Sequence, residues 1–171
     1  MDVIDAIRGR RSIRKFRSEG IPEDMMDRLI ESLILAPSAG NLQSRKFYFI
    51  KDDVVKKALA VAALGQNFIA KAPLVIVCCT DSRIENRYGE RGIHLYSIQD
   101  VSASIMSMML AAHEMGLGSV WVGAFNEGQV FDVLGMQAHL RPVSIVPVGW
   151  PDTEPSPTSR VSEEEAIAWV T

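Results

Sequence analysis

Apolar residues recur at helical spacing in some segments of the chain and form short uninterrupted runs in others. Pro22, Glu23 and Asp24 are typical of a first helical turn, and the apolar residues after them repeat every three or four positions until shortly before Pro37. The run Leu74–Thr80 is apolar almost throughout, which indicates a strand buried on both faces. The same patterns predict helices near residues 3–7, 53–63, 96–115, 127–134 and 162–165, and strands over 47–50, 120–123 and 143–148.

Helices separated by short strands indicate one α+β or α/β domain over residues 1–171. The helical pattern of Tyr96–Met115 is the longest, and Gly116 is its expected stop. This helix is apolar or small nearly all round, so we expect it to be buried in the core of one chain or between two chains. The proline-rich segment Pro151–Ser159 is expected to be irregular.

Composition excludes several classes of function. The chain has 171 residues, 47% of them hydrophobic, and a net charge of -3, which argues against a broad nucleic-acid or membrane-surface footprint. Any anion site must therefore come from a local cluster of Lys and Arg. The first residues lack the apolar core of a signal peptide, and no apolar stretch is long enough to cross a bilayer, so we expect a cytoplasmic protein.

Cysteine and histidine give no sign of a metal or disulfide framework. The only cysteines, Cys78 and Cys79, are adjacent in an apolar run and are expected to be buried as small hydrophobic residues. His94, His113 and His139 lack the spacing of metal ligands. We therefore expect no metal.

A basic segment near the start of the chain, RRSIRKF over residues 10–16, is the first candidate for chemistry. If this segment is extended, Arg10, Ser12 and Arg14 point to one side, and two guanidinium groups with a hydroxyl make a good phosphate receptor. On charge alone, a solvated basic edge is the favoured interpretation of the segment.

Two glycine-containing segments could place backbone and amide groups around a flat ligand. The loop APSAGNLQS over residues 36–44 offers Ser38, Asn41 and Gln43, although it could simply end a helix. In the segment GLGSVWVGAF over residues 116–125, small residues would allow a ring to approach the backbone, although glycines there are often helix caps. Neither segment is a dinucleotide fingerprint, because no GxGxxG opens a helix after a strand.

Four segments in this order resemble the nitroreductase family of FMN-dependent oxidoreductases. They are RRSIRKF, APSAGNLQSRKF, LAAHEMGLGSVWVGAF, and VPVGWP before the closing Arg160. The resemblance covers nearly the whole chain. It implies a three-layer α+β fold with a central, mostly antiparallel sheet flanked by helices, and a homodimer that binds FMN at its interface, each site using both subunits.

The resemblance also assigns flavin contacts to residues of this sequence. It implies that Arg10 holds the phosphate, with Arg11 and Arg160 beside it, and that Arg14 reaches the pyrimidine edge of the ring. The remaining contacts come from the loop that lies on the partner's flavin, from the turn facing the flavin N5 and, by a weaker match, from the segment before the buried strand. The predicted FMN-binding residues are Arg10, Arg11, Ser12, Arg14, Pro37, Ser38, Ala39, Asn41, Gln43, Gln66, Gly123, Ala124 and Arg160.

The implied reaction passes electrons from NAD(P)H through the flavin to a nitroaromatic, quinone or related small-molecule acceptor by a ping-pong mechanism. The flavin carries the chemistry, so we expect no catalytic acid or base and give Arg14 an electrostatic role. Alternatives on the same fold are a flavin-dependent dehalogenase, a flavin-destroying enzyme and a flavin-binding protein without turnover. Residues 70–96 lack the longer helical insertion of many relatives. The substrates of those relatives therefore cannot be assumed for this chain.

Overall fold

Strand β2 (Leu74–Asp81) lies in the middle of the structure, and all eight of its residues are buried. In the computed structural model, which describes residues 1–171, it pairs antiparallel with β1 (Arg45–Ile50) and β4 (Leu140–Gly149). The short strand β3 (Gly118–Ser119) pairs with the far side of β4, which gives the order β1-β2-β4-β3. The buried strand and the antiparallel sheet are both confirmed.

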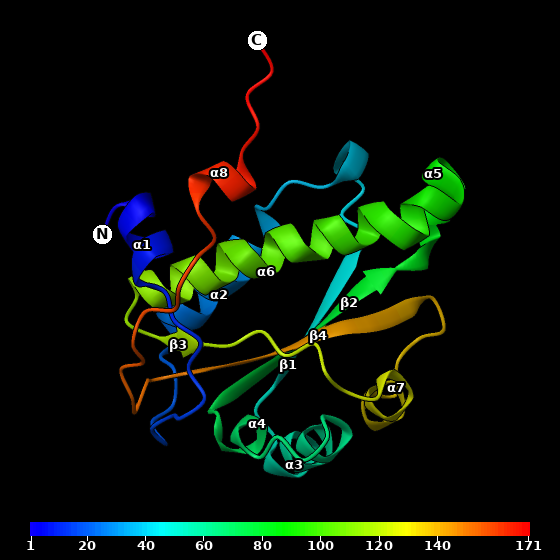
Figure 1. Cartoon of the computed structure of the whole chain (residues 1–171). Coiled ribbons are helices and arrows are strands. Elements are labelled where there is room, and N and C mark those ends of the chain that lie inside the picture. The colour runs from blue at the N-terminus through cyan, green and yellow to red at the C-terminus, as the bar shows by residue number, and fades with distance from the viewer.

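Successive side chains of β2 face two separate hydrophobic cores because strand residues alternate between faces. Leu74, Ile76 and Cys78 pack with the buried residues of α2 (Glu23–Ile34) and α6 (Ser97–Glu114). Val75, Val77 and Cys79 pack on the other face, which α3 (Asp53–Ala62), α4 (Phe68–Lys71) and α7 (Glu127–Leu134) cover. Figure 1 shows these three layers, which confirm the predicted architecture.

Side-chain caps explain where several helices begin. The Asp52 carboxylate accepts hydrogen bonds from the backbone N–H groups of Val54 and Val55, both at 2.9 Å, and so starts α3. The Asn126 side chain caps α7, whose bounds agree with the prediction. Ser162 and Glu165 form the predicted capping box of α8 (Glu163–Ala166).

The predicted strand over residues 120–123 is wrong in position. The strand comes earlier, at Gly118–Ser119, and of the predicted residues only Val122 makes a bridge, to Ile145. Val120 and Val122 are buried and Trp121 is exposed, so the side chains alternate as in a strand, but the backbone pairs with β4 at too few positions to form one. Helix α4 was not predicted because it has only four residues. The helical turns over residues 82–96, including α5 (Glu85–Arg91) and a π-helical turn before α6, were not predicted because they are short and mostly polar.

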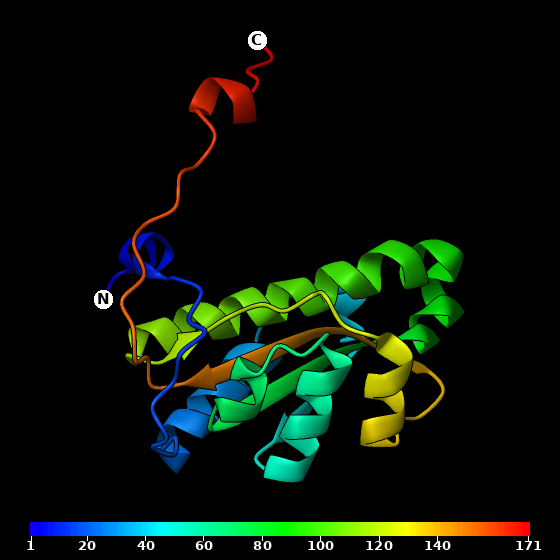
Figure 2. The same cartoon turned by 60° about the horizontal axis from the view of Figure 1, so that its bottom comes forward.

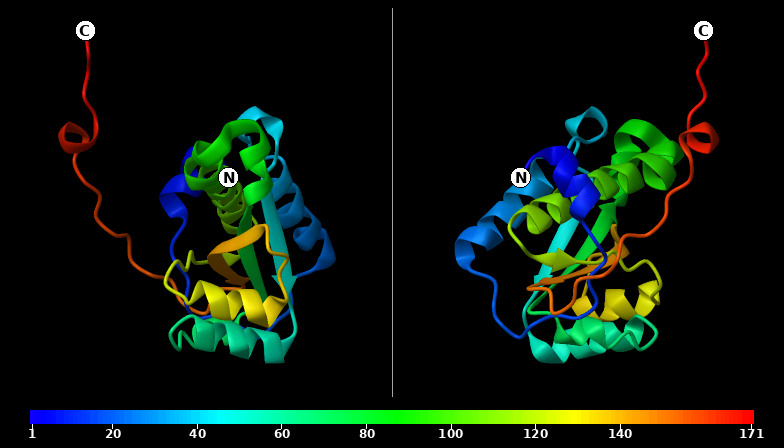
Figure 3. Two further views of the ribbon diagram at one scale, coloured as in Figure 1. Left: turned by 90° about the vertical axis from the view of Figure 1, so that its right-hand side faces the viewer. Right: turned by 60° about the vertical axis from the view of Figure 1, so that its left-hand side comes forward.

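The C-terminal segment leaves the body of the molecule after residue 155. Figures 2 and 3 show it rising alone past α1 (Val3–Gly9) and ending far from the sheet. Its large apolar side chains are exposed, including Trp169 at 83% and Val170 at 98%. Side chains of this kind are usually covered, so this segment is a candidate contact for another chain.

Both cysteines are free and fully buried, as predicted. Burial raises the pKa of the Cys79 thiol to about 12 and that of Cys78 well above its ordinary value, so neither is a reactive thiolate. No helix combines the length and apolar character that a bilayer crossing requires. No group of three or more His, Cys, Asp or Glu residues is placed to hold a metal ion.

Candidate functional site

The basic segment follows α1 directly and is fixed to the edge of the sheet. Arg10 ends this helix, and its backbone N–H donates to the Ala6 carbonyl at 3.0 Å. The chain then runs beside β3, where the Ile13 N–H donates to the Ser119 carbonyl at 3.0 Å. Ser12 forms a parallel bridge with the same serine. The segment is thereby held against the turn that follows α6.

A cavity of about 510 Å³ opens between the basic segment, the end of α6 and the start of the C-terminal segment. Gly116 and Gly118 form part of its wall, so the backbone after α6 is open to a ligand. Its lining residues come from four separate stretches of sequence: Met1, Gly9, Arg10, Arg11, Ile13, His113, Gly116, Leu117, Gly118, Ser119, Pro151, Thr153, Glu154 and Pro155.

Positive charge collects at this cavity, and no carboxylate forms an ion pair with it. Burial first, and then the nearby Arg160 and Arg11, lower the pKa of Arg10. None of these three arginines makes an ion pair, although Glu154 lines the same cavity. Arg11 and Arg160 donate to nearby backbone carbonyls, whereas the Arg10 guanidinium makes no hydrogen bond within the chain. A phosphate group would relieve the repulsion and accept from Arg10, so the residues present fit the phosphate end of FMN.

His113 is a residue of this cavity that the sequence did not single out. Burial, Arg10 and Arg11 lower its pKa, which favours a neutral imidazole in this structure. Its ring lies against Gly9, where an added Cβ would come within 2.5 Å of the histidine Nε2. A possible signal was its position in the last turn of the long helix, three residues before Gly116.

The other predicted residues of the basic segment lie differently from the expected alternation. Arg10, Arg11 and Ile13 line the cavity, whereas Ser12 and the exposed Arg14 do not. Arg10 still belongs to the end of α1, so the extended conformation starts only after it. The expectation that Arg10, Ser12 and Arg14 point to one side of an extended segment is therefore wrong.

The predicted loop over residues 37–43 is built around left-handed backbone. Gly40, Asn41 and Gln43 have φ angles of 54°, 56° and 52°, which is uncommon for a glutamine. The Ser38 hydroxyl accepts a hydrogen bond from the Gln43 N–H at 3.0 Å. The Gln43 side-chain amide also donates to the Asn41 side-chain oxygen at 3.4 Å, so these polar groups lie close together.

This loop and the basic cavity lie at opposite ends of α6. The Ala39 N–H donates to Asp100, in the first turn of that helix, whereas His113 lies in its last turn. The rise of an α-helix separates these two positions by about 20 Å along the axis. Figure 1 shows the long helix between them. One chain alone does not bring the two predicted groups together.

Gln66 and the turn at Gly123 and Ala124 do meet. The Gln66 side-chain amide donates to the Ala124 carbonyl at 3.0 Å and to the Ala63 carbonyl at 2.9 Å. A Cβ added at Gly123 would meet nothing within 4 Å, so a flat group has room there. Gly123 and Ala124 are exposed, and Leu64 near them adopts a φ of 59°.

Comparison with known proteins gives one consistent relationship. Residues 7–83 and 60–150 match the profile of the nitroreductase family. A protein of Methanothermobacter thermautotrophicus named putative NADH dehydrogenase/NAD(P)H nitroreductase is 32% identical over 91% of this chain and 80% of its own length. A Thermus thermophilus NADH dehydrogenase is 28% identical over 99% of this chain and 96% of its own.

Solved structures agree with this relationship. Nitroreductase A from Vibrio parahaemolyticus superimposes with a TM-score of 0.92 at 26% identity, over 100% of this chain and 77% of that one. The NADPH:FMN oxidoreductase from Vibrio harveyi, solved with NAD+, gives 0.91 at 25% identity, over 99% and 77%. The match of sequence and fold extends over nearly the whole chain, and the protein therefore belongs to the nitroreductase family.

Proposed function

We propose that this chain is an NAD(P)H-dependent FMN oxidoreductase that reduces nitroaromatics, quinones or related small molecules. The group of unneutralised guanidinium side chains at the cavity supports this function most directly, because it is suited to a phosphorylated ligand. Relatives named FMN reductase and oxygen-insensitive NADPH nitroreductase support the same reaction class. We propose residues 1–171 as a single FMN-binding domain.

In this proposal Arg10, Arg11 and Arg160 hold the phosphate of FMN. When bound there, FMN would supply hydride acceptance from NAD(P)H and electron transfer to the acceptor, so the two substrates would use the site in turn. Gln66, Gly123 and Ala124 would hold the N5 side of the ring. No side chain of the site acts as a general acid or base; the protein orients the ring and sets the field around it.

We propose that the working form is a homodimer. The residues predicted to touch one flavin lie at both ends of α6, and an antiparallel partner would bring its loop over residues 37–43 towards the cavity of the first chain. The exposed side chains of Ile167, Trp169 and Val170 would then gain a surface to cover them. The cytoplasmic location stays a prediction.

The first experiment tests for flavin and for turnover together. Purified protein mixed with FMN should turn yellow, lose its 450 nm absorbance when NADH or NADPH is added without oxygen, and recover it when a nitroaromatic is added. Tight FMN binding without bleaching would indicate a flavin-binding protein without turnover. A protein that ignores added FMN would contradict the proposal. Release of iodide from an iodinated tyrosine, or breakdown of the flavin, would indicate the alternative reactions.

Replacing Arg14 with glutamine should lower the flavin midpoint potential. The reduced ring carries negative charge near N1 and the C2 carbonyl, and a cation at that edge stabilises it. Loss of about 1 kcal/mol of such stabilisation, a modest value for an exposed charge, corresponds to roughly 20 mV for a two-electron couple. Spectroelectrochemical titration measures the potential, with Lys15→Gln as the control from the adjacent exposed position. An unchanged potential in Arg14→Gln would refute this role.

A further inference from the structure

The loop over residues 37–43 combines a few hydrogen bonds of its own, among them that from the Gln43 N–H to the Ser38 hydroxyl, with a strained backbone. Within it, the Asn41 N–H donates to the Ser38 carbonyl at 3.0 Å and the Leu42 N–H to the Ala39 carbonyl at 3.1 Å. Three residues with positive φ, two of them not glycine, make its backbone conformation costly. A loop of this kind persists only if groups outside it fix its position.

Arg45, the first residue of β1, supplies one set of these outside contacts. Its guanidinium donates to the carbonyls of Ile34 at 2.9 Å, Ala36 at 2.7 Å and Pro37 at 3.1 Å. It also reaches the Asp100 backbone carbonyl at 3.3 Å. The planar arginine head thus spans the backbone that leads from α2 into the loop.

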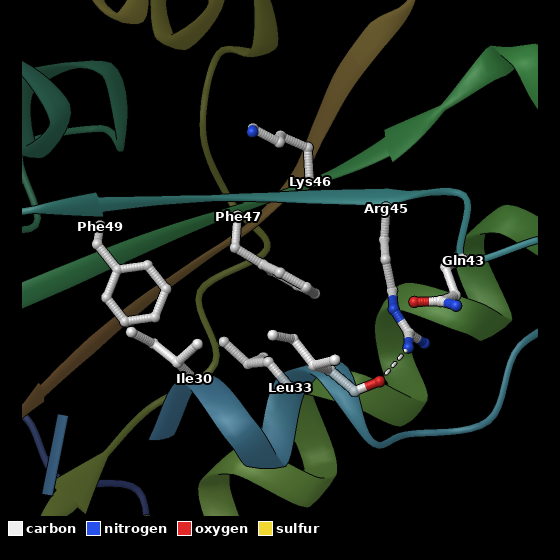
Figure 4. A pocket seen from close by; sticks show the side chains of 8 residues that line it. Ile30, Leu33, Gln43, Arg45, Lys46, Phe47 and Phe49 are labelled. Carbon is white, nitrogen blue, oxygen red and sulfur yellow. Dashed lines mark hydrogen bonds between the residues drawn. The ribbon is translucent and has the colours of Figure 1, made fainter. Parts of the chain in front are cut away.

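The side chain of Arg45 is directed towards α2, together with Phe47 and Phe49 on the same face of β1. Figure 4 shows this arrangement and the bond to the carbonyl of Ile34. The neighbouring Lys46 points to the opposite face and makes no ion pair. Burial lowers the pKa of Arg45, and the charge of Asp100 opposes that change.

Asp100 holds the loop from the other side. It lies in the first turn of α6, is only 4% exposed, and accepts a hydrogen bond at one carboxylate oxygen from the Ala39 N–H at 2.8 Å. Its second oxygen has no donor within the chain. A buried carboxylate with a single backbone donor is costly for stability, which suggests that it is kept for another reason.

We propose that Arg45 and Asp100 are positioning residues that fix the loop over residues 37–43 for FMN bound by the partner subunit. Neither side chain touches the flavin. Arg45 sets the path of residues 34–37, and Asp100 sets Ala39, so that the loop has its flavin-binding shape before the ligand arrives. This inference rests on the proposed function, and it adds two residues to which the family resemblance gave no role.

Substitution of Arg45 separates this role from a general effect of charge. Arg45→Met should weaken FMN binding about tenfold, because the ligand must then order the loop itself. Lys46→Met, the matched control on the same strand, should bind FMN as the unmodified protein does. Arg45→Lys retains the charge but cannot span several carbonyls, so its FMN affinity should lie between those of Arg45→Met and the unmodified protein. Fluorescence quenching of FMN on titration gives each dissociation constant.

The substitutions at Asp100 test the second contact. Asp100→Asn retains an acceptor for the Ala39 N–H and should keep most of the affinity, whereas Asp100→Ala should lose about tenfold. Rescue by the asparagine variant would support positioning through that hydrogen bond. Equal affinity of the alanine variant and the unmodified protein would contradict it.

Mixed dimers show whether the loop acts on the partner's site and not through the overall fold. Differently tagged copies, one carrying Arg10→Met and the other Arg45→Met, are produced together and purified on both tags. In the mixed dimer one site combines both changes and the other has neither, so tight binding should recover to one FMN per dimer. A mixed dimer with no tight site would overturn the proposal, since both sites would then be impaired.

The possible failures are distinguishable. If the unmodified protein binds no FMN, the proposed function and this inference are both refuted. If it binds FMN and Arg45→Met and Asp100→Ala bind equally well, only the positioning role is refuted. A change in melting temperature without loss of FMN affinity likewise refutes it, because Arg45 and Asp100 would then be structural only.

Discussion

Arg10→Met should weaken FMN binding about a hundredfold while leaving the affinity for riboflavin, which has no phosphate, nearly unchanged. Arg10 is half-buried at the cavity, close to Arg11 and Arg160. Its hydrogen bonds to a phosphate would be charge-assisted, and the loss of one side of such a pair costs about 3 kcal/mol, which is roughly a hundredfold. Titration of protein fluorescence with FMN and with riboflavin measures both affinities.

Two further variants sharpen this test. Arg8→Met removes an exposed guanidinium of the same helix that does not line the cavity, and it should leave both affinities unchanged. Arg10→Lys keeps the charge but loses the bidentate geometry of the guanidinium. Its FMN affinity should therefore lie between those of Arg10→Met and the unmodified protein. Equal loss of FMN and riboflavin binding in Arg10→Met would place the side chain away from the phosphate.

Periodicity identified the parts of the fold that depend on a single strong pattern. The largely apolar run Leu74–Thr80 and the amphipathic Glu23–Ile34 became a central strand and a covering helix. Periodicity did not predict elements that form only by pairing with residues distant in sequence. The strand at Gly118–Ser119 exists because Gly149 and Val148 lie beside it, a contact that local spacing does not contain.

The candidate site shows the same division. Local sequence was enough to mark the basic segment, because two adjacent arginines in an acidic chain are conspicuous. It could not show that His113 would face them, since this contact depends on the packing of α1 on α6. Nor could it assign Arg45 and Asp100 to one loop, because they are 55 residues apart in sequence.

Gly118→Ala should lower the free energy of unfolding by about 2 kcal/mol, within the range for forcing an extra methyl group into a packed site. A Cβ at this buried position would lie 2.6 Å from Ile13 Cγ1 and 2.8 Å from its Cβ. Ile13 is branched at Cβ and its N–H is bonded to Ser119, so it cannot turn aside without moving the backbone. That movement would displace Arg10 and Arg11, and FMN affinity should fall with stability.

Gly128→Ala is the matched control for this effect. Gly128 lies inside α7, where an added Cβ would meet only the Asn126 side-chain oxygen at an ordinary 3.4 Å. Alanine favours a helix over glycine by at most about 1 kcal/mol, so this variant should be as stable as the unmodified protein or more stable. Urea unfolding followed by circular dichroism gives both values. If Gly118→Ala matched Gly128→Ala in stability and in FMN affinity, close contact between β3 and Ile13 could not be what holds the arginines at the cavity.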